Sequence, residues 1–177
     1  MKDLFRKYSA ILLIAIVIVA LDQWTKGLVR ANIPQGGTWL PESWAWLSPY
    51  ARIVHWYNTG AAFGMFKDAS MVLTVLAFIV IGAILFYYPQ VSQDDWSLRL
   101  ALSMQLGGAV GNLIDRLTIG HVTDFISVGN FPVFNVADAS ISVGAAVLFL
   151  GVWLQERAEK KRQAAAAVEA AGDTSGE

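Results

Sequence analysis

The chain has 177 residues, of which 55% are hydrophobic and 15% are charged. Soluble domains carry about 25% charged residues, so this composition indicates a membrane protein. The net charge of −1, without aromatic and basic residues interleaved, excludes a nucleic-acid-binding protein. Because the chain has no cysteine, disulfides, thiolate metal sites, a cysteine nucleophile and lipid attachment to cysteine are excluded too.

Four apolar segments approach the roughly 20 residues that a membrane-spanning helix needs: residues 8–28, 70–88, 98–114 and 137–154. Basic residues precede the first segment, as in a signal peptide, but no small-x-small cleavage site follows, so we expect a retained helix. The sequence predicts an all-α membrane protein with four transmembrane helices in one domain, residues 1–155. Residues 156–177 are charged and then alanine-rich, and we expect a fraying helix with a disordered end there.

Basic residues mark the cytoplasmic side of a membrane protein. They precede the first segment and follow the last: Lys2, Arg6, Lys7, Arg157, Lys160, Lys161 and Arg162. Both termini and the tail are therefore predicted to be cytoplasmic, and residues 29–69 and 115–136 to form the outer loops. The first loop is rich in Trp and Tyr, which favours a position on the membrane surface. Residues 51–57 have strand composition, so we expect a small, partly β outer region.

Several polar residues fall at membrane depth, where an ionisable side chain costs about 2.5–3.5 kcal/mol on insertion scales. Asp22 and Lys26 have the i, i+4 spacing and order of a favourable helical ion pair, and snorkelling to the surface is the other interpretation. Glycines between residues 107 and 111 predict close helix packing. Asn112 and Arg116, on one helix face, flank Asp115 in the chain. A solvated helix end remains an open interpretation for them.

Asp124 and Asp138 lie in apolar surroundings just before and at the start of the last segment. Glycines and a proline between them exclude one continuous helix. In the simplest interpretation, Asp138 or Asn135 is a helix N-cap and Asp124 is a solvated loop acid. If the two carboxyls instead face each other, the pair holds one proton near neutral pH and supplies an acid and a base. Such a pair can activate water against an amide carbonyl, so peptide hydrolysis is a hypothesis.

The sequence lacks the residue patterns that other catalytic chemistries need. The only histidines, His55 and His121, lie on different outer loops without His-Glu-x-x-His spacing, so we expect interfacial or hydrogen-bonded residues rather than zinc ligands. No Gly-x-Ser-x-Gly elbow occurs, and no signature supports a serine dyad with Lys26 or Lys67. Two non-peptidase hypotheses stay open. One is a small proton-coupled membrane carrier that uses the same aspartates and Asp22. The other is an assembly subunit that binds a partner through the glycine-rich helix face.

Five motifs carry a family resemblance. They are Leu21-Asp-Gln-x-x-Lys26, Asn58-Thr-Gly-Ala-Ala-Phe-Gly64, Gly107-Gly-Ala-x-Gly-Asn-x-x-Asp-Arg116, Val122-x-Asp-Phe-Ile126 and Phe134-Asn-x-Ala-Asp138. In this order they resemble the lipoprotein signal peptidases (signal peptidase II), membrane aspartyl peptidases of bacteria. The resemblance covers about residues 10–155, and only the spacer between the last two motifs is short.

The resemblance implies that Asp124 and Asp138 are the catalytic dyad. It implies supporting or substrate-binding roles for Asp22, Asn58, Asn112, Asp115, Arg116 and Asn135. The implied substrates are prolipoproteins cut before a diacylglyceryl-modified cysteine, and the implied inhibitors are globomycin-like cyclic peptides. We expect no metal or organic cofactor, a monomer among membrane lipids, and a multi-pass protein of the bacterial cytoplasmic (inner) membrane with its active site at the periplasmic face. The first outer loop is expected to close on the substrate, with Gly60 and Gly64 allowing movement.

Overall fold

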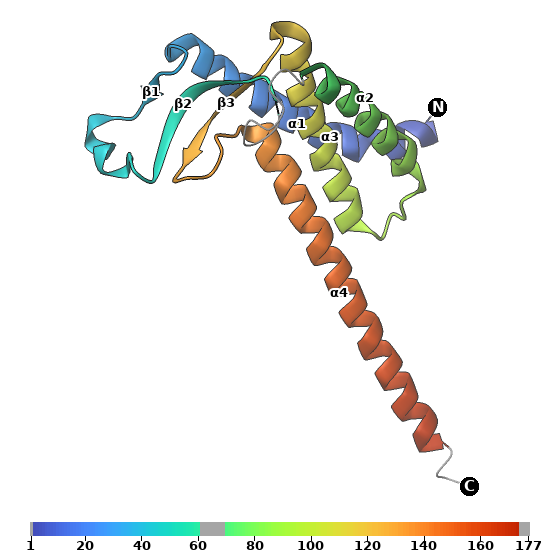
Figure 1. Ribbon diagram of the computed structural model, residues 1–177. Coiled ribbons are helices and arrows are strands. Elements are labelled where there is room, and N and C mark those ends of the chain that lie inside the picture. The colour runs from blue at the N-terminus through green and yellow to red at the C-terminus, as the bar shows by residue number, and fades with distance from the viewer. Residues whose placement is uncertain (1, 61–69, 174–177) are drawn as a thin grey trace.

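The structure, a computed structural model, describes residues 2–60 and 70–173, and describes side chains for residues 8–60 and 70–163. Its α-helices are α1 (Lys2–Asn32), α2 (Ser70–Tyr87), α3 (Trp96–Ile119) and α4 (Val136–Asp173). Short 3-10 helices are η1 (Glu42–Leu47) and η3 (Tyr88–Gln90), and the strands are β1 (Thr38–Trp39), β2 (Ala51–Asn58) and β3 (Val122–Val128). Figure 1 shows the sheet beside one end of the helices, and α4 running far beyond the start of α3.

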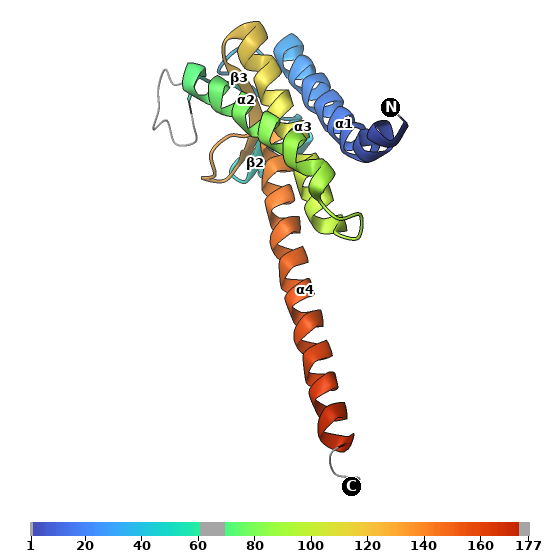
Figure 2. The same cartoon turned by 90° about the vertical axis from the view of Figure 1, so that its right-hand side faces the viewer.

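Three of these helices are long and apolar enough to cross a membrane, among the residues described: Tyr8–Asn32, Ser70–Gln90 and Val136–Gln163. They agree with three of the four predicted segments and confirm a mostly helical membrane protein. The fourth segment, residues 98–114, forms most of α3. Its hydropathy is lower because polar and small side chains, such as Ser103, Gly108 and Asn112, are buried on this helix. α3 packs against α1, α2 and α4, and Figure 2 shows it among them from a second direction.

The glycines of α3 allow close helix contact, as predicted. A Cβ at Gly107 would lie 2.8 Å from Cβ of Ile18 in α1, and a Cβ at Gly108 would lie 2.5 Å from the carbonyl oxygen of Ala137 in α4. Helices of the same chain therefore cover this glycine-rich face. The hypothesis of an assembly subunit that binds a partner through this face is wrong.

The sheet is antiparallel with the order β1-β2-β3. The strand predicted at residues 51–57 is confirmed as β2. In the second predicted outer loop, α3 ends at Gly120 with a φ of 79°, and β3 follows. After a turn at Gly129, Phe134 pairs with Ile126 through backbone hydrogen bonds of 2.8 and 3.1 Å. This return places the start of α4 beside Asp124.

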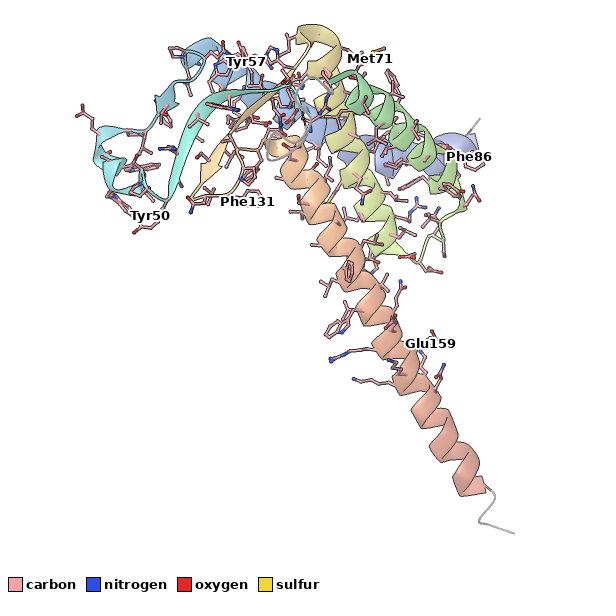
Figure 3. All side chains as sticks on the ribbon, viewed as in Figure 1. Tyr50, Tyr57, Met71, Phe86, Phe131 and Glu159 are labelled. Carbon is pink, nitrogen blue, oxygen red and sulfur yellow. The ribbon has the colours of Figure 1, made fainter. Side chains whose placement is uncertain are left out.

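Aromatic side chains of the sheet region are widely exposed: Trp39, Trp44, Trp46, Tyr50, Trp56 and Phe131. Figure 3 shows Tyr50 and Phe131 near the same end of the sheet. At the opposite end of the chain, the charged segment expected to be a tail continues α4 as a helix to Asp173, and its described side chains are exposed. Residues 174–177 lie outside the described residues.

Candidate active site

The fold brings Asp124 of β3 and Asp138 of the first turn of α4 together, and Asn135 joins them. The Asn135 side-chain Nδ2 donates to Asp124 Oδ1 at 2.7 Å, and its Oδ1 accepts the backbone N–H of Asp138 at 2.9 Å. In return, the backbone N–H of Asn135 donates to Asp138 Oδ2 at 3.3 Å. This reciprocal pair is a capping box, so Asn135 is the N-cap of α4, as the simplest interpretation allowed. The same interpretation is wrong for Asp124, which is only 1% exposed.

The two carboxyl groups interact electrostatically. Burial is the main cause that raises the pKa of Asp124, and the negative charge of Asp138 raises it further. Hydrogen bonds from Asn58 and Asn135 and the charge of Lys26 act in the opposite direction, and the result is a pKa of about 7 for Asp124. One proton is therefore available on this pair near neutral pH.

Two further asparagines donate to the dyad. Asn58 Nδ2 donates to Asp124 Oδ2 at 2.8 Å, and Asn112 Nδ2 donates to Asp138 Oδ1 at 2.8 Å. These residues come from β2 and α3, so four elements of the fold converge on the two aspartates. Each carboxylate receives two N–H donors, which hold it in a fixed orientation.

A buried charged cluster lies behind the dyad. Lys26 Nζ contacts Asp22 Oδ2 at 2.8 Å, Asn112 Oδ1 at 2.9 Å and Asp115 Oδ2 at 3.2 Å. The predicted ion pair of Asp22 and Lys26 is confirmed, and snorkelling is wrong because both side chains are 0% exposed. Asp22 Oδ1 also accepts the backbone N–H of Ala137 at 2.9 Å. Since the first N–H groups of a helix have no partner within it, Asp22 of α1 satisfies one of them in α4.

Three residues of this cluster were missed by sequence reasoning. Gln23 donates to both Asp22 and Asp115, and Arg30 donates to Asp115 Oδ1 at 3.2 Å and to Thr123 Oγ1 at 3.1 Å. The backbone N–H of Thr123 donates to Asp115 Oδ2 at 3.0 Å. Arg30 follows Lys26 by four residues, so helical spacing offered a signal for it. Gln23 stands in the first of the five motifs, although no role was inferred for it, and no sequence signal pointed to Thr123.

A cavity of about 500 Å³ opens beside the dyad. Its polar lining comes from Asn58, Arg116, Asp138 and Ser142, and most of the other lining residues are apolar, among them Leu73, Phe131, Pro132, Phe134, Ile141 and Val143. Arg116 is half-buried and lies within the electrostatic field of Asp138, Asp124 and Asp115. The interpretation of Asn112 and Arg116 as a solvated helix end is wrong for Asn112, which is buried, and Asp115 between them is buried too. Of the two aspartates Asp138 lines the cavity and Asp124 is buried behind it, so the arrangement offers one carboxyl and a cation at the cavity wall and a second carboxyl next to them.

Among the described contacts, neither histidine binds Asp124 or Asp138. His55 Nδ1 pairs with the carbonyl oxygen of Ile33 at 2.7 Å, which confirms a hydrogen-bonded role. The ring of His121 packs on Tyr57 with 3.8 Å between centroids. In the part of the chain that the structure describes, no three His, Asp or Glu side chains are grouped to hold a metal ion.

Fold and site together define a membrane-embedded hydrolase with two carboxyl groups at its centre, and comparisons with known proteins specify the family. The model of the family described as signal peptidase (SPase) II matches residues 14–154. The lipoprotein signal peptidase of Halalkalibacterium halodurans is 38% identical over 85% of this chain and 96% of its own length. That of Mesorhizobium japonicum is 37% identical over 81% of this chain and 84% of its own length.

A solved bacterial membrane enzyme, determined by the in meso method at 2.3 Å resolution, superposes with a TM-score of 0.76 and 27% identity. The superposition covers 86% of this chain and 92% of that one. The chain therefore belongs to the signal peptidase II family and is a multi-pass membrane peptidase. Nothing in the comparisons favours the carrier hypothesis.

Proposed function

We propose that this peptidase removes the signal peptides of prolipoproteins by cutting before a diacylglyceryl-modified cysteine, with Asp124 and Asp138 as the catalytic dyad. The observation that carries the proposal is the pair of carboxyls bridged by Asn135, with Asp138 in the wall of an apolar cavity. The family supplies the substrate class, since its relatives carry the name lipoprotein signal peptidase. An apolar cavity beside the dyad suits the lipid and the hydrophobic signal peptide on either side of the scissile bond.

The proposed reaction uses one proton shared by the dyad. The carboxylate of Asp138 takes a proton from a water molecule while the resulting hydroxide attacks the scissile carbonyl carbon. Asp124, with its pKa of about 7, gives its proton to the carbonyl oxygen. When the tetrahedral intermediate collapses, Asp138 protonates the leaving nitrogen and Asp124 recovers a proton from the intermediate, so the dyad ends in its starting state.

The supporting residues divide by what they touch. Asn58, Asn112 and Asn135 orient the carboxyls, and Asp22 and Asp115 hold the helix ends and strand that carry them. Arg116 lines the cavity and has a charge suited to a substrate carbonyl or a lipid ester. Globomycin-like cyclic peptides would inhibit by filling the same cavity. Closure of the first outer loop stays a prediction, because Gly64 lies outside the described residues, although Gly60 lines the cavity.

We further propose that residues 1–155 form one domain with four transmembrane helices, of which α3 is the fourth span. Both termini and the charged tail would be cytoplasmic, and the protein would be a monomer in the bacterial inner membrane. Arg157 lies 4.0 Å above the ring of Trp153, a pair typical of the membrane surface. Asp138 precedes Trp153 by 15 residues, or about 22 Å of helix. With Trp153 at the inner surface, Asp138 lies in the outer third of a hydrocarbon core about 30 Å thick. A diacylglyceryl group would hold a scissile bond at that depth.

The test is cleavage of a diacylglyceryl-modified prolipoprotein by the purified protein in detergent. Asp124→Asn and Asp138→Asn proteins of matched folding are expected to lose cleavage. Asp94→Asn makes the same chemical change at an exposed position of the α2–α3 connection and is expected to keep it. Cleavage by either dyad variant, or absence of cleavage by the unmodified sequence under conditions where a known lipoprotein signal peptidase is active, would contradict the proposal.

A further inference from the structure

Three asparagine side chains donate to the dyad, and each has its amide oxygen held by a group that can only donate. The Asn58 oxygen accepts the backbone N–H of Gly60 at 3.0 Å, and the Asn135 oxygen accepts the backbone N–H of Asp138 at 2.9 Å. An amide that accepts on its oxygen must present its NH2 group on the other side. For Asn58 and Asn135 the backbone therefore sets which end of the amide faces a carboxylate.

Asn112 differs because a side chain sets its orientation. Its oxygen accepts from Lys26 Nζ at 2.9 Å and from Asn135 Nδ2 at 3.1 Å, so its NH2 group is left to donate to Asp138 at 2.8 Å. An ammonium group has donors and no acceptor, so it cannot pair with the NH2 end of Asn112.

The ammonium group of Lys26 is itself fully used. It has three protons and three acceptors, on Asp22, Asp115 and Asn112, and the side chain is 0% exposed. Either aspartate would neutralise the charge, so the contact with Asn112 is not needed for charge balance. The contact with Asn112 does link Lys26 and the buried cluster to Asp138 of the dyad.

We propose that Lys26 is a positioning residue of the dyad: by binding the Asn112 oxygen it turns the Asn112 NH2 group toward Asp138. The inference rests on the proposed function, because it assigns Lys26 a role in a reaction carried out by Asp124 and Asp138. Without Lys26, the Asn112 oxygen keeps only the donor from Asn135 Nδ2 at 3.1 Å, so the amide is held less firmly and can turn round. Its oxygen then faces Asp138 and stabilises a protonated carboxyl rather than the carboxylate that acts as base.

Other charges face the dyad and must be separated from this effect. Asp22 of α1 and Arg116 of α3 act on it, Asp115 and Arg30 lie one contact further away in the buried cluster, and the positive charge of Lys26 also acts on both aspartates directly. Removing Lys26 changes charge and amide orientation together. The double variant Lys26→Met with Asp22→Asn removes one charge of each sign, so it changes the orientation with the net charge preserved.

The experiment measures kcat and KM against pH for the full chain in detergent with a diacylglyceryl-modified prolipoprotein. For Lys26→Met we expect the pH–rate profile to move to higher pH by about one unit, the lower end of the effect of a neighbouring charge, with kcat reduced more than KM is changed. The double variant is expected to keep a displaced profile. Lys26→Arg retains a donor and a charge, and is expected to return the profile to the wild-type position.

Arg30→Gln is the matched control, because it removes a cation from the same cluster without touching Asn112. It is expected to lower thermal stability and leave the profile in place. A wild-type profile in folded Lys26→Met, or in the double variant if Lys26→Met does not fold, overturns the inference. The inference is also overturned if Lys26→Met displaces the profile and the double variant has the wild-type profile, because charge alone then explains the displacement. Activity of Asp124→Asn or Asp138→Asn would contradict the proposed function itself, so the two failures are distinguishable.

Discussion

Asn135 caps α4 and also donates to Asp124, and the substitution Asn135→Ser keeps the first contact while it removes the second. Serine is as good an N-cap as asparagine, so the bond to the Asp138 N–H is kept and α4 keeps its cap. What is lost is the Nδ2 donor, which binds Asp124 Oδ1 at 2.7 Å and also contacts Asn112 Oδ1 at 3.1 Å and the carbonyl oxygen of Thr123 at 3.5 Å. A hydrogen bond to a charged group contributes about 1.5–3 kcal/mol, and one pKa unit corresponds to about 1.4 kcal/mol.

The pKa of Asp124 should therefore rise from about 7 by about one to two units in Asn135→Ser. If Asp124 supplies the proton in catalysis, the alkaline limb of the pH–rate profile moves to higher pH by the same amount. The assay is cleavage of a lipid-modified prolipoprotein between pH 5 and 10, with thermal unfolding followed on the same samples.

A matched control exists at the other end of the bundle. Asp95 is the N-cap of α3, accepting the backbone N–H of Leu98 at 3.1 Å, and it makes no contact with the dyad among the described contacts. Asp95→Ala should cost about 1 kcal/mol of stability and leave the profile unchanged. An unchanged alkaline limb in folded Asn135→Ser would refute the assignment of Asp124 as the proton donor.

Three further predictions concern stability and substrate binding. The pKa of Asp124 in the folded state is raised above its unfolded value of about 3.9, so the protein should lose up to about 4 kcal/mol of stability as pH rises from 4 through 7. Thermal unfolding against pH measures this loss, and Asp124→Asn should make the stability less dependent on pH. Gly108→Ala would bring a Cβ to 2.5 Å from the Ala137 carbonyl oxygen and should cost about 1–3 kcal/mol of stability. Gly82→Ala, with open space around it, should be neutral or stabilising. Equal stability of the two variants would contradict the α3–α4 contact. Arg116→Gln should raise KM about tenfold with a smaller change in kcat in steady-state kinetics, and an unchanged KM would exclude a substrate-binding role.

Local patterns in the sequence predicted the parts of the fold that depend on neighbours along the chain. The apolar segments gave the positions of helices, strand composition gave β2, and the i, i+4 spacing gave the pair of Asp22 and Lys26. Glycine spacing predicted close helix contact, which the structure places against α1 and α4. The weak point was α3, whose buried polar side chains lower its hydropathy because they serve the interior of the protein.

Contacts between distant segments were not predictable from local patterns. Asp22 binds the backbone N–H of Ala137 across 115 positions of the chain, and Asp115 accepts donors from both α1 and β3. Spacing alone left a solvated helix end open for Asn112 and Arg116, since nothing local showed that Lys26 and Asn135 would bind Asn112. The dyad itself was indicated by the family resemblance. The residues alone left an N-cap as the alternative, and the structure shows that Asn135 is the cap and the bridge together.

This double use of side chains explains why three buried charged residues, Asp22, Lys26 and Asp115, and the partly exposed Arg30 can lie behind the dyad. Asp22, Lys26, Arg30 and Asp115 carry charges that sum to zero, and every one of them has an oppositely charged partner within 3.2 Å. Asp22 and Asp115 also accept backbone N–H groups of α4 and β3, the two elements that carry the aspartates, whereas Lys26 and Arg30 bind the side chains of Asn112 and Thr123. Replacing Asp22, Lys26 or Asp115 alone leaves an uncompensated buried charge, which is strongly destabilising. Changes at these three residues should therefore alter folding and catalysis together, whereas Arg30→Gln, at the partly exposed edge of the cluster, should alter stability alone.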